Sequence, residues 1–315
     1  MTMLRYVIRR LVLAAVVLVL LSVAVFAATE VLPGDAGDVV AGVDASPEER
    51  ARVRAELGLD RPAVMRYLDW ASGAVRGDLG TGFVGRRAVA DVVADRLPNS
   101  LLLAALALVV AVPIAVALGL AAGMRAGRPL DRWISGVTQA MVGIPEFVTA
   151  GLLLAVFAVW WPVLPQVSLV PLGASPLHAP EILVLPVLTL SVVGLAAATR
   201  LIRASAADIS ATPYVESARL NGVYGLRLAV RHVLPGAWGP AVQALALTTA
   251  GLVGGTVVVE NVFGYPGIGR ELQLAVAGRD IPMVQGIALS LCAVTLVTLL
   301  IGDVIARLID PRGAA

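Results

Sequence analysis

Few side chains in this sequence have the types and spacing that catalysis or metal binding requires. The 315 residues contain two histidines, His178 and His232, and a single cysteine, Cys292, which lies in an apolar run. Neither histidine has partners at the spacing of metal ligands. Lysine is absent, which excludes a Schiff base and the lysine of a Walker A phosphate loop. Because no serine–histidine–aspartate or paired-carboxylate arrangement is present either, we expect no catalytic residues, no metal and no cofactor in this chain.

The polar segment 212–222 has the pattern of a short capped helix. Thr212 can accept a hydrogen bond from a free backbone N–H at the helix start, Pro213 fits the first helical position, and Gly222 can adopt the left-handed conformation that ends a helix. Tyr214 and Ala218 are four residues apart and therefore share one face. Helices this short are marginal alone in water, which favours a helix that docks on a partner. An ordinary connector is the alternative.

Five polar residues within or beside apolar stretches are candidates for a translocation path or gate. An acid at membrane depth is costly and usually functional, and Glu146 directly follows a proline that can kink a helix. A pathway role, a structural ion pair and an interfacial position are all open for Glu146. Gln139 and Gln243 could line a path or bond between helices. Glu260 and Asn261 could form part of an outer gate or cap the interface.

The composition requires lipid as the solvent for most of the chain. Hydrophobic residues make up 58% of the sequence and charged residues 15%, against about 25% charged residues in soluble domains. A helix needs about 20 apolar residues to cross the hydrocarbon core. Six apolar stretches are long enough, so we predict an all-α integral membrane protein with six transmembrane helices, at Leu11–Ala28, Leu101–Met124, Ile134 to the Trp160–Pro162 cluster, Ile182–Thr199, Gly236–Val259 and Met283–Gly302.

The arginines set the expected orientation, because cytoplasmic loops are enriched in basic residues. They cluster before the first span, between the second and third, between the fourth and fifth, and after the sixth. Both termini and the loop 200–235 are therefore expected in the cytoplasm. The formal net charge is only +2, and the basic residues are distributed by membrane side rather than gathered in a patch that could bind nucleic acid.

The predicted organisation has three parts. Residues 1–30 form the first transmembrane helix, for which a cleaved signal peptide is the alternative. Residues 31–97 form a small helical extracytoplasmic insertion between helices 1 and 2, with a capping box at Ser46 and Glu49 and a second helix from about Arg61 to Gly77. Residues 98–312 form a five-helix transmembrane core.

Ordered sequence blocks run along nearly the whole chain. One consists of Glu216-Ser217-Ala218, then Gly222, then His232-Val233-Leu234-Pro235. It is similar to the EAA loop of ABC importer permeases, with Ser217 where alanine is usual and His232 where an apolar residue is common. Together, the blocks resemble the first permease subunit of the dipeptide/oligopeptide (peptide/nickel type) ABC importers. The other blocks are Leu4-Arg5-Tyr6, Arg9-Arg10, Leu32-Pro33-Gly34-Asp35, Leu57 to Pro62, Gly77-Asp78-Leu79-Gly80, Arg96 to Ser100, Val259 to Arg270, Arg279-Asp280, Pro282, Gln285 and Asp310-Pro311-Arg312.

This resemblance implies a type I ABC importer permease fold in a bacterial plasma membrane. The implied partners are a second, homologous permease, two ABC ATPases that carry ATP and Mg, and an extracytoplasmic substrate-binding protein. Residues 213–221 would be the coupling helix that contacts an ATPase. Di- or oligopeptides are the implied cargo, and nickel chelates, glutathione or oligosaccharides are alternatives. The implied ATPase-coupling residues are Thr212, Pro213, Tyr214, Glu216, Ser217, Ala218 and Gly222.

An ion-coupled secondary transporter is a hypothesis of another class. Such proteins usually show inverted repeats or buried charge relays near the middle of the membrane. The sequence has no clear repeat, and Glu146 is the only acid well inside a span. A membrane scaffold without transport activity is a third hypothesis, and it would leave the capped cytoplasmic helix without a moving partner.

Overall fold

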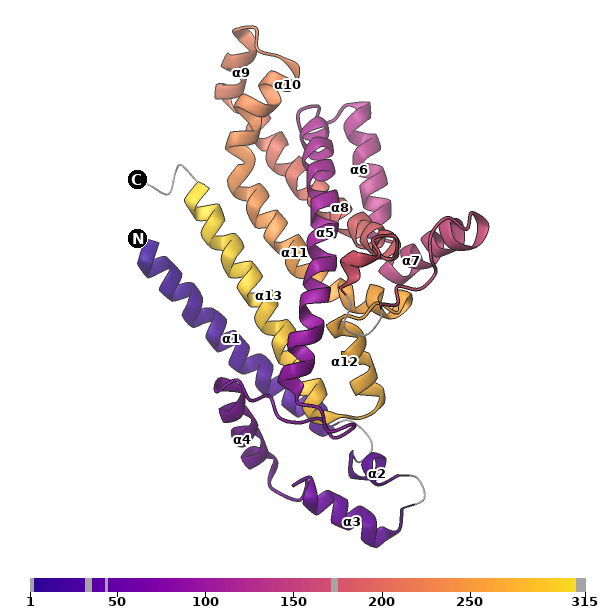
Figure 1. Cartoon of the computed structure of the whole chain (residues 1–315). Helices are drawn as coiled ribbons and strands as arrows, with labels where there is room; N and C mark the ends of the chain where they lie inside the picture. Colours follow the sequence, from indigo (N-terminus) through magenta and orange to yellow (C-terminus); the bar gives the residue numbers. More distant parts are fainter. Residues whose placement is uncertain (1–2, 32–35, 43–44, 171–174, 310–315) are drawn as a thin grey trace. The chain divides into compact units, whose positions relative to one another are not determined.

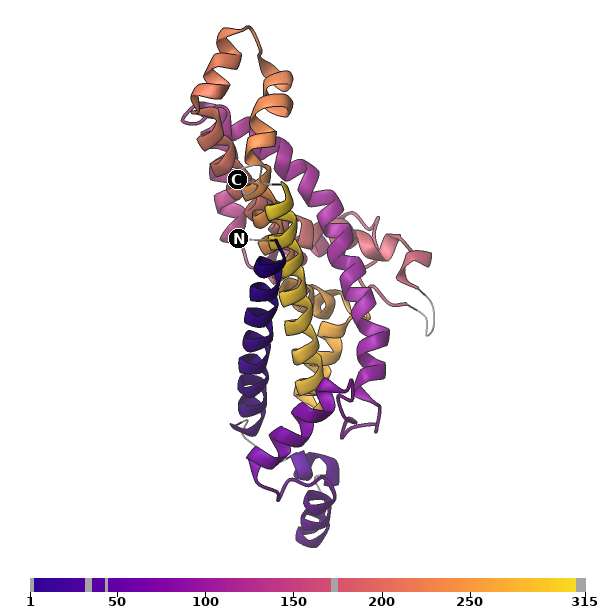
Figure 2. The same ribbon diagram turned by 90° about the vertical axis from the view of Figure 1, so that its left-hand side faces the viewer.

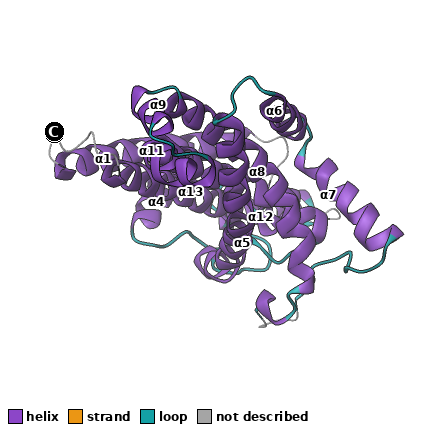
Figure 3. Cartoon of the chain, turned by 90° about the horizontal axis from the view of Figure 1, so that it is seen from above, coloured by secondary structure: helices purple, strands orange, loops and turns teal. Residues whose placement is uncertain are grey.

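The computed structural model describes residues 3–31, 36–42, 45–170 and 175–309. Regular structure in these ranges is helical, apart from one isolated bridge between Thr81 and Ala88 (Figure 3). Two of the sequence blocks quoted above, Leu32–Asp35 and Asp310–Arg312, lie outside the described residues.

Five helices are long and apolar enough to cross a membrane. Four of them cover the whole of a span predicted from the sequence and extend beyond it, because polar residues at the ends continue the helix. The helix α5 begins before its predicted span and ends one residue before Met124. Five of the six predicted transmembrane helices are therefore confirmed as single helices by length and composition. They are α1 (Met3–Val31), α5 (Val89–Gly123), α8 (Glu181–Ser210), α11 (Leu234–Phe263) and α13 (Ile281–Ile309).

The third predicted span is broken. It consists of α6 (Pro129–Val142) and of α7 (Glu146–Leu154), which continues as the π-helical turn η1 (Ala155–Trp160). The two parts are bent by 97°, and Figure 3 shows α7 leaving in a different direction from α6. Pro145 causes the break because it lacks an N–H and disfavours the helical conformation of the residue before it. Counted as one bent span, the pair brings the number of spans to six.

The chain forms two compact units. The first comprises Met1–Ser100 and Pro266–Leu296, and the second comprises Leu101–Tyr265 and Val297–Ala315. Besides α1, the first unit contains α2 (Ala36–Ala41), α3 (Pro47–Glu56), α4 (Ala63–Val75) and α12 (Ile268–Ala277) (Figure 1). The helices α5 and α13 each contribute residues to both units.

The helices predicted between the first two spans are present in the first unit. At the start of α3, the Glu49 N–H donates to the Ser46 hydroxyl and the Ser46 N–H donates to the Glu49 carboxylate, which confirms the capping box. These bonds hold the pKa of Glu49 below its usual value. The second expected helix is α4, which packs on α1 with the Tyr67 hydroxyl 2.9 Å from the Ser22 hydroxyl.

Sequence blocks that are far apart in the chain meet in the first unit. The Asn99 side-chain amide donates to the Pro266 carbonyl at 2.9 Å, and the Ser100 hydroxyl accepts the Ile268 N–H at 2.9 Å. These bonds join the interior of α5, which begins at Val89, to the turn before α12 and to its first residue, Ile268. The blocks around these residues therefore have a structural role: they fix the start of α12 against α5.

The first part of α13 lies beside α1 in the same unit (Figure 2). The Gln285 side-chain amide donates to the Thr29 hydroxyl at 2.7 Å, and both side chains are buried. A buried amide needs such a partner, since an unpaired polar group away from water is costly.

In the second unit, α8 and α11 pack against each other and α7 packs against both (Figure 1). Their core includes Leu185, Leu190, Leu252 and Val259. The second half of α5 also approaches α8 closely. A Cβ atom at Gly123 would lie 2.6 Å from a backbone carbonyl oxygen of α8, so only glycine fits at this contact.

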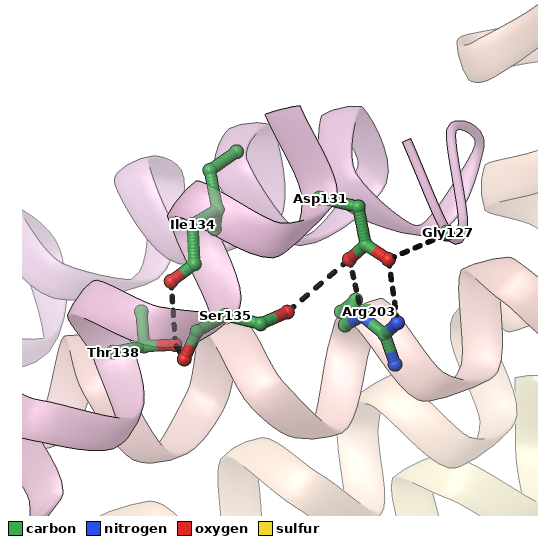
Figure 4. Close-up of polar contacts among 6 residues, drawn as sticks. All are labelled: Gly127, Asp131, Ile134, Ser135, Thr138 and Arg203. Carbon is green, nitrogen blue, oxygen red and sulfur yellow. Dashed lines mark hydrogen bonds and ion pairs between the residues drawn. The ribbon is translucent and has the colours of Figure 1, made fainter. Parts of the chain in front are cut away.

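A buried ion pair joins α6 to α8 (Figure 4). The Asp131 side chain is 3% exposed, and the Arg203 guanidinium donates to its two oxygens at 2.6 and 2.7 Å. The Gly127 N–H donates to the same carboxylate at 2.8 Å, and the Ser135 hydroxyl donates at 3.2 Å. Four donors therefore compensate for the burial of one charge, which is the condition under which a buried ion pair is tolerated.

Removing the guanidinium should destabilise the second unit. We expect Arg203→Ala to lower the free energy of unfolding by about 3–5 kcal/mol, because Asp131 would remain buried without its counter-ion. Arg203→Lys should recover only part of the loss, since an ammonium group cannot donate the two parallel bonds. Unfolding of the purified chain in detergent, followed by helical circular dichroism, measures both.

The matched control is the exposed ion pair between Arg54 and Asp60, whose side chains are 41% and 58% exposed. Arg54→Ala should change the free energy of unfolding by less than about 1 kcal/mol. Equal effects of Arg203→Ala and Arg54→Ala would contradict the importance assigned to the buried pair.

Candidate functional site

The predicted helix within the loop 200–235 is present as α9 (Pro213–Leu220). Pro213 occupies the first helical turn, as expected. The cap expected from Thr212 is wrong: its hydroxyl donates to the Ile209 carbonyl at 2.7 Å and accepts no N–H of α9. The hydroxyl turns back because α8 extends to Ser210, which places a helix-end carbonyl within its reach.

The end of α9 follows the sequence expectation. Gly222 has φ +81°, the left-handed conformation that glycine adopts without strain. The Gly222 N–H donates to the Arg219 carbonyl, and the Val223 N–H donates to the Ala218 carbonyl, both at 3.0 Å. These two bonds form a Schellman motif, which satisfies carbonyls that the helix end would otherwise leave without partners.

One face of α9 is buried in the second unit. Val215 is 0% exposed and Ala218 8% exposed, and both pack with Leu120 of α5 and Ala206 of α8. Tyr214 and Ala218 were expected to offer one apolar surface to a partner. This is wrong for Ala218, because its side chain is buried in the core of the second unit. The buried face fixes α9 on the ends of two membrane-crossing helices.

The opposite face of α9 is exposed. It carries Glu216, Ser217 and Leu220, and Leu220 is 83% exposed. Tyr214 is 60% exposed at the flank of the helix, one turn before Ala218. The exposed side chains of α9 are therefore an aromatic ring, a carboxylate and a large apolar group. Such a combination suits a docking surface better than a solvated loop.

A contact that the sequence did not suggest connects α9 to the start of α11. The Tyr214 hydroxyl lies 2.9 Å from Nδ1 of His232, and their rings are 5.5 Å apart. His232 lies in the π-helical turn η3 (Ala229–Val233), which follows α10 (Gly225–Leu228) and leads into α11. The sequence contained one indication of this contact. His232 stands where an apolar residue is common in the family, and a polar side chain at such a position needs a hydrogen-bond partner.

Glu146 lies in the first turn of α7, at the bend of the third span, and is half-buried. A Cβ atom on Gly255 of α11 would lie 2.9 Å from the Glu146 carboxylate and 3.6 Å from Leu190. The carboxylate therefore rests on α11 where a side chain is missing. The first turn of a helix also favours a negative charge.

The other four path candidates are dispersed in the second unit. Gln139 of α6 and Gln243 of α11 are exposed. Glu260, in the last turn of α11, is fully buried, and the Asn261 amide donates to the Val257 carbonyl of its own helix at 2.7 Å. Within the described part of the chain, no group of three or more His, Cys, Asp and Glu side chains could hold a metal ion.

Two family models match the chain. Residues 115–314, more than half of the sequence, match the family described as binding-protein-dependent transport system inner membrane component. Residues 3–104 match the N-terminal membrane component of the same transport systems.

Similar proteins span the full length. The glutathione transport system permease protein GsiC of Escherichia coli strain CFT073 is 36% identical over 309 residues, which are 98% of this chain and 98% of that protein. The proteins of the same name from Escherichia coli K12 and Shigella flexneri serotype 5b are 35% identical over the same shares. The resemblance drawn from the sequence blocks is thereby confirmed, and the chain belongs to the family of binding-protein-dependent ABC importer permeases of the peptide/nickel type, as a multi-pass membrane component and not an enzyme.

Proposed function

We propose that this chain forms half of the translocation pathway of an ATP-driven peptide importer and that α9 transmits the movement of an ATPase to it. The observation that carries the proposal is the division of α9 into two faces. Val215 and Ala218 hold the helix on α5 and α8, while Glu216 and Leu220 remain exposed on the opposite face. A helix fixed in this way transmits a displacement to the membrane helices.

The ATPases are expected on separate chains. This chain has no lysine, and the Walker A loop of an ATPase requires one. ATP and Mg would therefore bind to two partner ATPases. An extracytoplasmic binding protein would deliver the cargo. In the proposed orientation both termini and α9 are cytoplasmic, because the arginine-rich loops lie on that side of a bacterial plasma membrane.

A second, homologous permease would complete the pathway. An exposed stripe on α11 suits this role, since Gln243, Leu247, Gly251 and Gly254 follow one another at helical spacing. A face turned to lipid would carry large apolar side chains, whereas this stripe contains an amide and two glycines. Close approach of another helix or contact with a polar cargo accounts for both features.

Peptides are the cargo that we propose. The similar proteins described above carry glutathione in their names, and glutathione is itself a tripeptide. Glu146 fits such a cargo, because a carboxylate at the bend of a span can bind the ammonium group at a peptide's amino terminus. Two observations support a pathway role for Glu146: it directly follows the break in the third span, and its carboxylate lies against Gly255.

Reversing the charge on the exposed face of α9 should uncouple the importer. We expect Glu216→Arg to reduce the co-purifying ATPases and ATP-driven peptide uptake at least about ten-fold, since a like-charge contact in an interface costs several kcal/mol. The measurement is affinity purification of the tagged chain in mild detergent, followed by uptake in liposomes with and without ATP. Gly222→Pro should act in the same direction, because proline cannot adopt φ +81°.

The control is Glu48→Arg, the same charge reversal at an exposed position in α3. It should retain the ATPases and the uptake. A chain that moves peptide in liposomes without ATP and without partners would refute the importer and favour an ion-coupled transporter.

The role of Glu146 can be tested without removing it. Gly255→Ala should displace the carboxylate at little cost in stability, because the new Cβ meets the mobile end of the side chain at 2.9 Å. We expect Gly255→Ala and Glu146→Gln to reduce uptake of peptides with a free amino terminus about ten-fold relative to N-acetylated peptides, the loss expected of one charge-assisted hydrogen bond. Competition uptake of labelled peptide pairs in liposomes measures the ratio.

Gly239→Ala is the matched control, since Gly239 lies in the same helix and nothing lies within 4 Å of its added Cβ. It should leave the ratio unchanged. An unchanged ratio in both Glu146→Gln and Gly255→Ala would remove Glu146 from the pathway.

A further inference from the structure

A hollow of about 580 Å³ lies beside α9 in the second unit. It is bounded by the last turns of α5, by the loop from α5 to α6, by α9 and by α10. Its lining combines two kinds of surface that do not ordinarily occur together. One part is apolar and comes from the membrane-crossing helix α5 and from the α10–η3 segment, and the other part carries several positive charges.

The charged part of the hollow consists of Arg125, Arg128 and Arg219. No residue of the described chain that lines the hollow is acidic. The three guanidinium groups have no ion pair with another described residue. Asp131 is close in sequence, but both of its oxygens are occupied by Arg203 and the Gly127 N–H (Figure 4). The hollow therefore has a net positive charge and would attract an anion.

The apolar part follows one face of α5. Ala117, Leu120, Ala121 and Met124 recur at intervals of three or four residues, so they form a continuous stripe. Seven residues of helix correspond to about 10 Å along the axis. Two of the four are alanines, which leave room for a chain-like ligand along the helix.

We propose that this hollow binds an anionic phospholipid, with its phosphate on the three arginines and the start of an acyl chain along the α5 stripe. Arginine forks match phosphate oxygens, and basic pockets between membrane helices on the cytoplasmic side are suited to anionic headgroups. An inorganic phosphate ion would use the arginines but gain nothing from the apolar stripe. Tyr224, 67% exposed at the rim, has the amphipathic ring that favours the headgroup level.

The site would tie the lipid to the coupling segment, because Arg219 belongs to α9 itself. An anionic lipid would hold α9 to the loop between α5 and α6 by bridging Arg219 to Arg125 and Arg128. The position of this site in the cytoplasmic leaflet rests on the proposed function. Binding of the lipid to the purified chain can be measured whether or not the proposed function is correct.

Native mass spectrometry of the full chain in detergent tests the proposal, with titration by dioleoyl phosphatidylglycerol, dioleoyl phosphatidylcholine and inorganic phosphate. Phosphatidylglycerol should bind at least ten-fold more tightly than phosphatidylcholine. The combined variant Arg125→Gln, Arg128→Gln and Arg219→Gln should lose that preference, with an affinity lower by roughly ten- to a hundred-fold. Ala117→Trp should also weaken phosphatidylglycerol, because the indole ring would fill the apolar stripe.

The matched control is the combined variant Arg132→Gln, Arg227→Gln and Arg231→Gln, which removes the same charge from exposed positions outside the hollow. It should retain the preference. An equal loss in the control would show general surface attraction and overturn the site. Tight binding of inorganic phosphate that Ala117→Trp leaves unchanged would show a simple anion site. A hollow variant that keeps its lipid but loses its ATPases would assign the arginines to the ATPase interface.

Discussion

The burial of Val215 and Ala218 is the contact on which the position of α9 in the second unit depends. An eight-residue helix is not stable alone in water, so its position is set by the core that it enters. That core is built from the ends of α5 and α8 and from the α10–η3 segment. Any force on α9 therefore reaches two membrane-crossing helices directly, without passing through a flexible loop. The Schellman motif at Gly222 ends the helix and satisfies two of its last carbonyl groups, and the glycine itself has no side chain.

A single turn of α8 fixes two neighbours in different ways. Its backbone lies so close to α5 that Gly123 cannot carry a side chain. One residue on the same turn, Arg203, extends its guanidinium to Asp131 of α6. Backbone contact and charge pairing are both short-range and geometrically demanding, so α5, α6 and α8 have little freedom to slide past one another near α9. The end of the unit that carries α9 is therefore the part best suited to move as one body.

The membrane-crossing segments were predictable because lipid imposes two simple conditions, apolar side chains and internally bonded backbone. Proline at the first helical position and glycine at the end located α9 in the polar loop. Prediction from the sequence failed where distant parts of the chain decide the outcome. Ala218 turns inward because α5 and α8 offer it a core, and Thr212 bonds backward because α8 runs eleven residues beyond the predicted span end at Thr199, to Ser210. The pairing of Asp131 with Arg203, 72 residues apart, leaves no local pattern in the sequence.

The bend after α6 supports the second permease that we propose as a partner. Residues 143–145 are exposed and interrupt the helix inside a predicted span. Backbone groups at such a break cannot face hydrocarbon, so they must be covered by protein or line a space that contains water. Glu146 follows the break, where the start of α7 stabilises its charge and Gly255 leaves it room. Among the described residues of this chain, none buries residues 143–145, and Glu146 is only half-buried. A second permease on this side would cover the break and enclose the carboxylate, and that places the acid beside the interface of the two subunits, where a pathway between them would run.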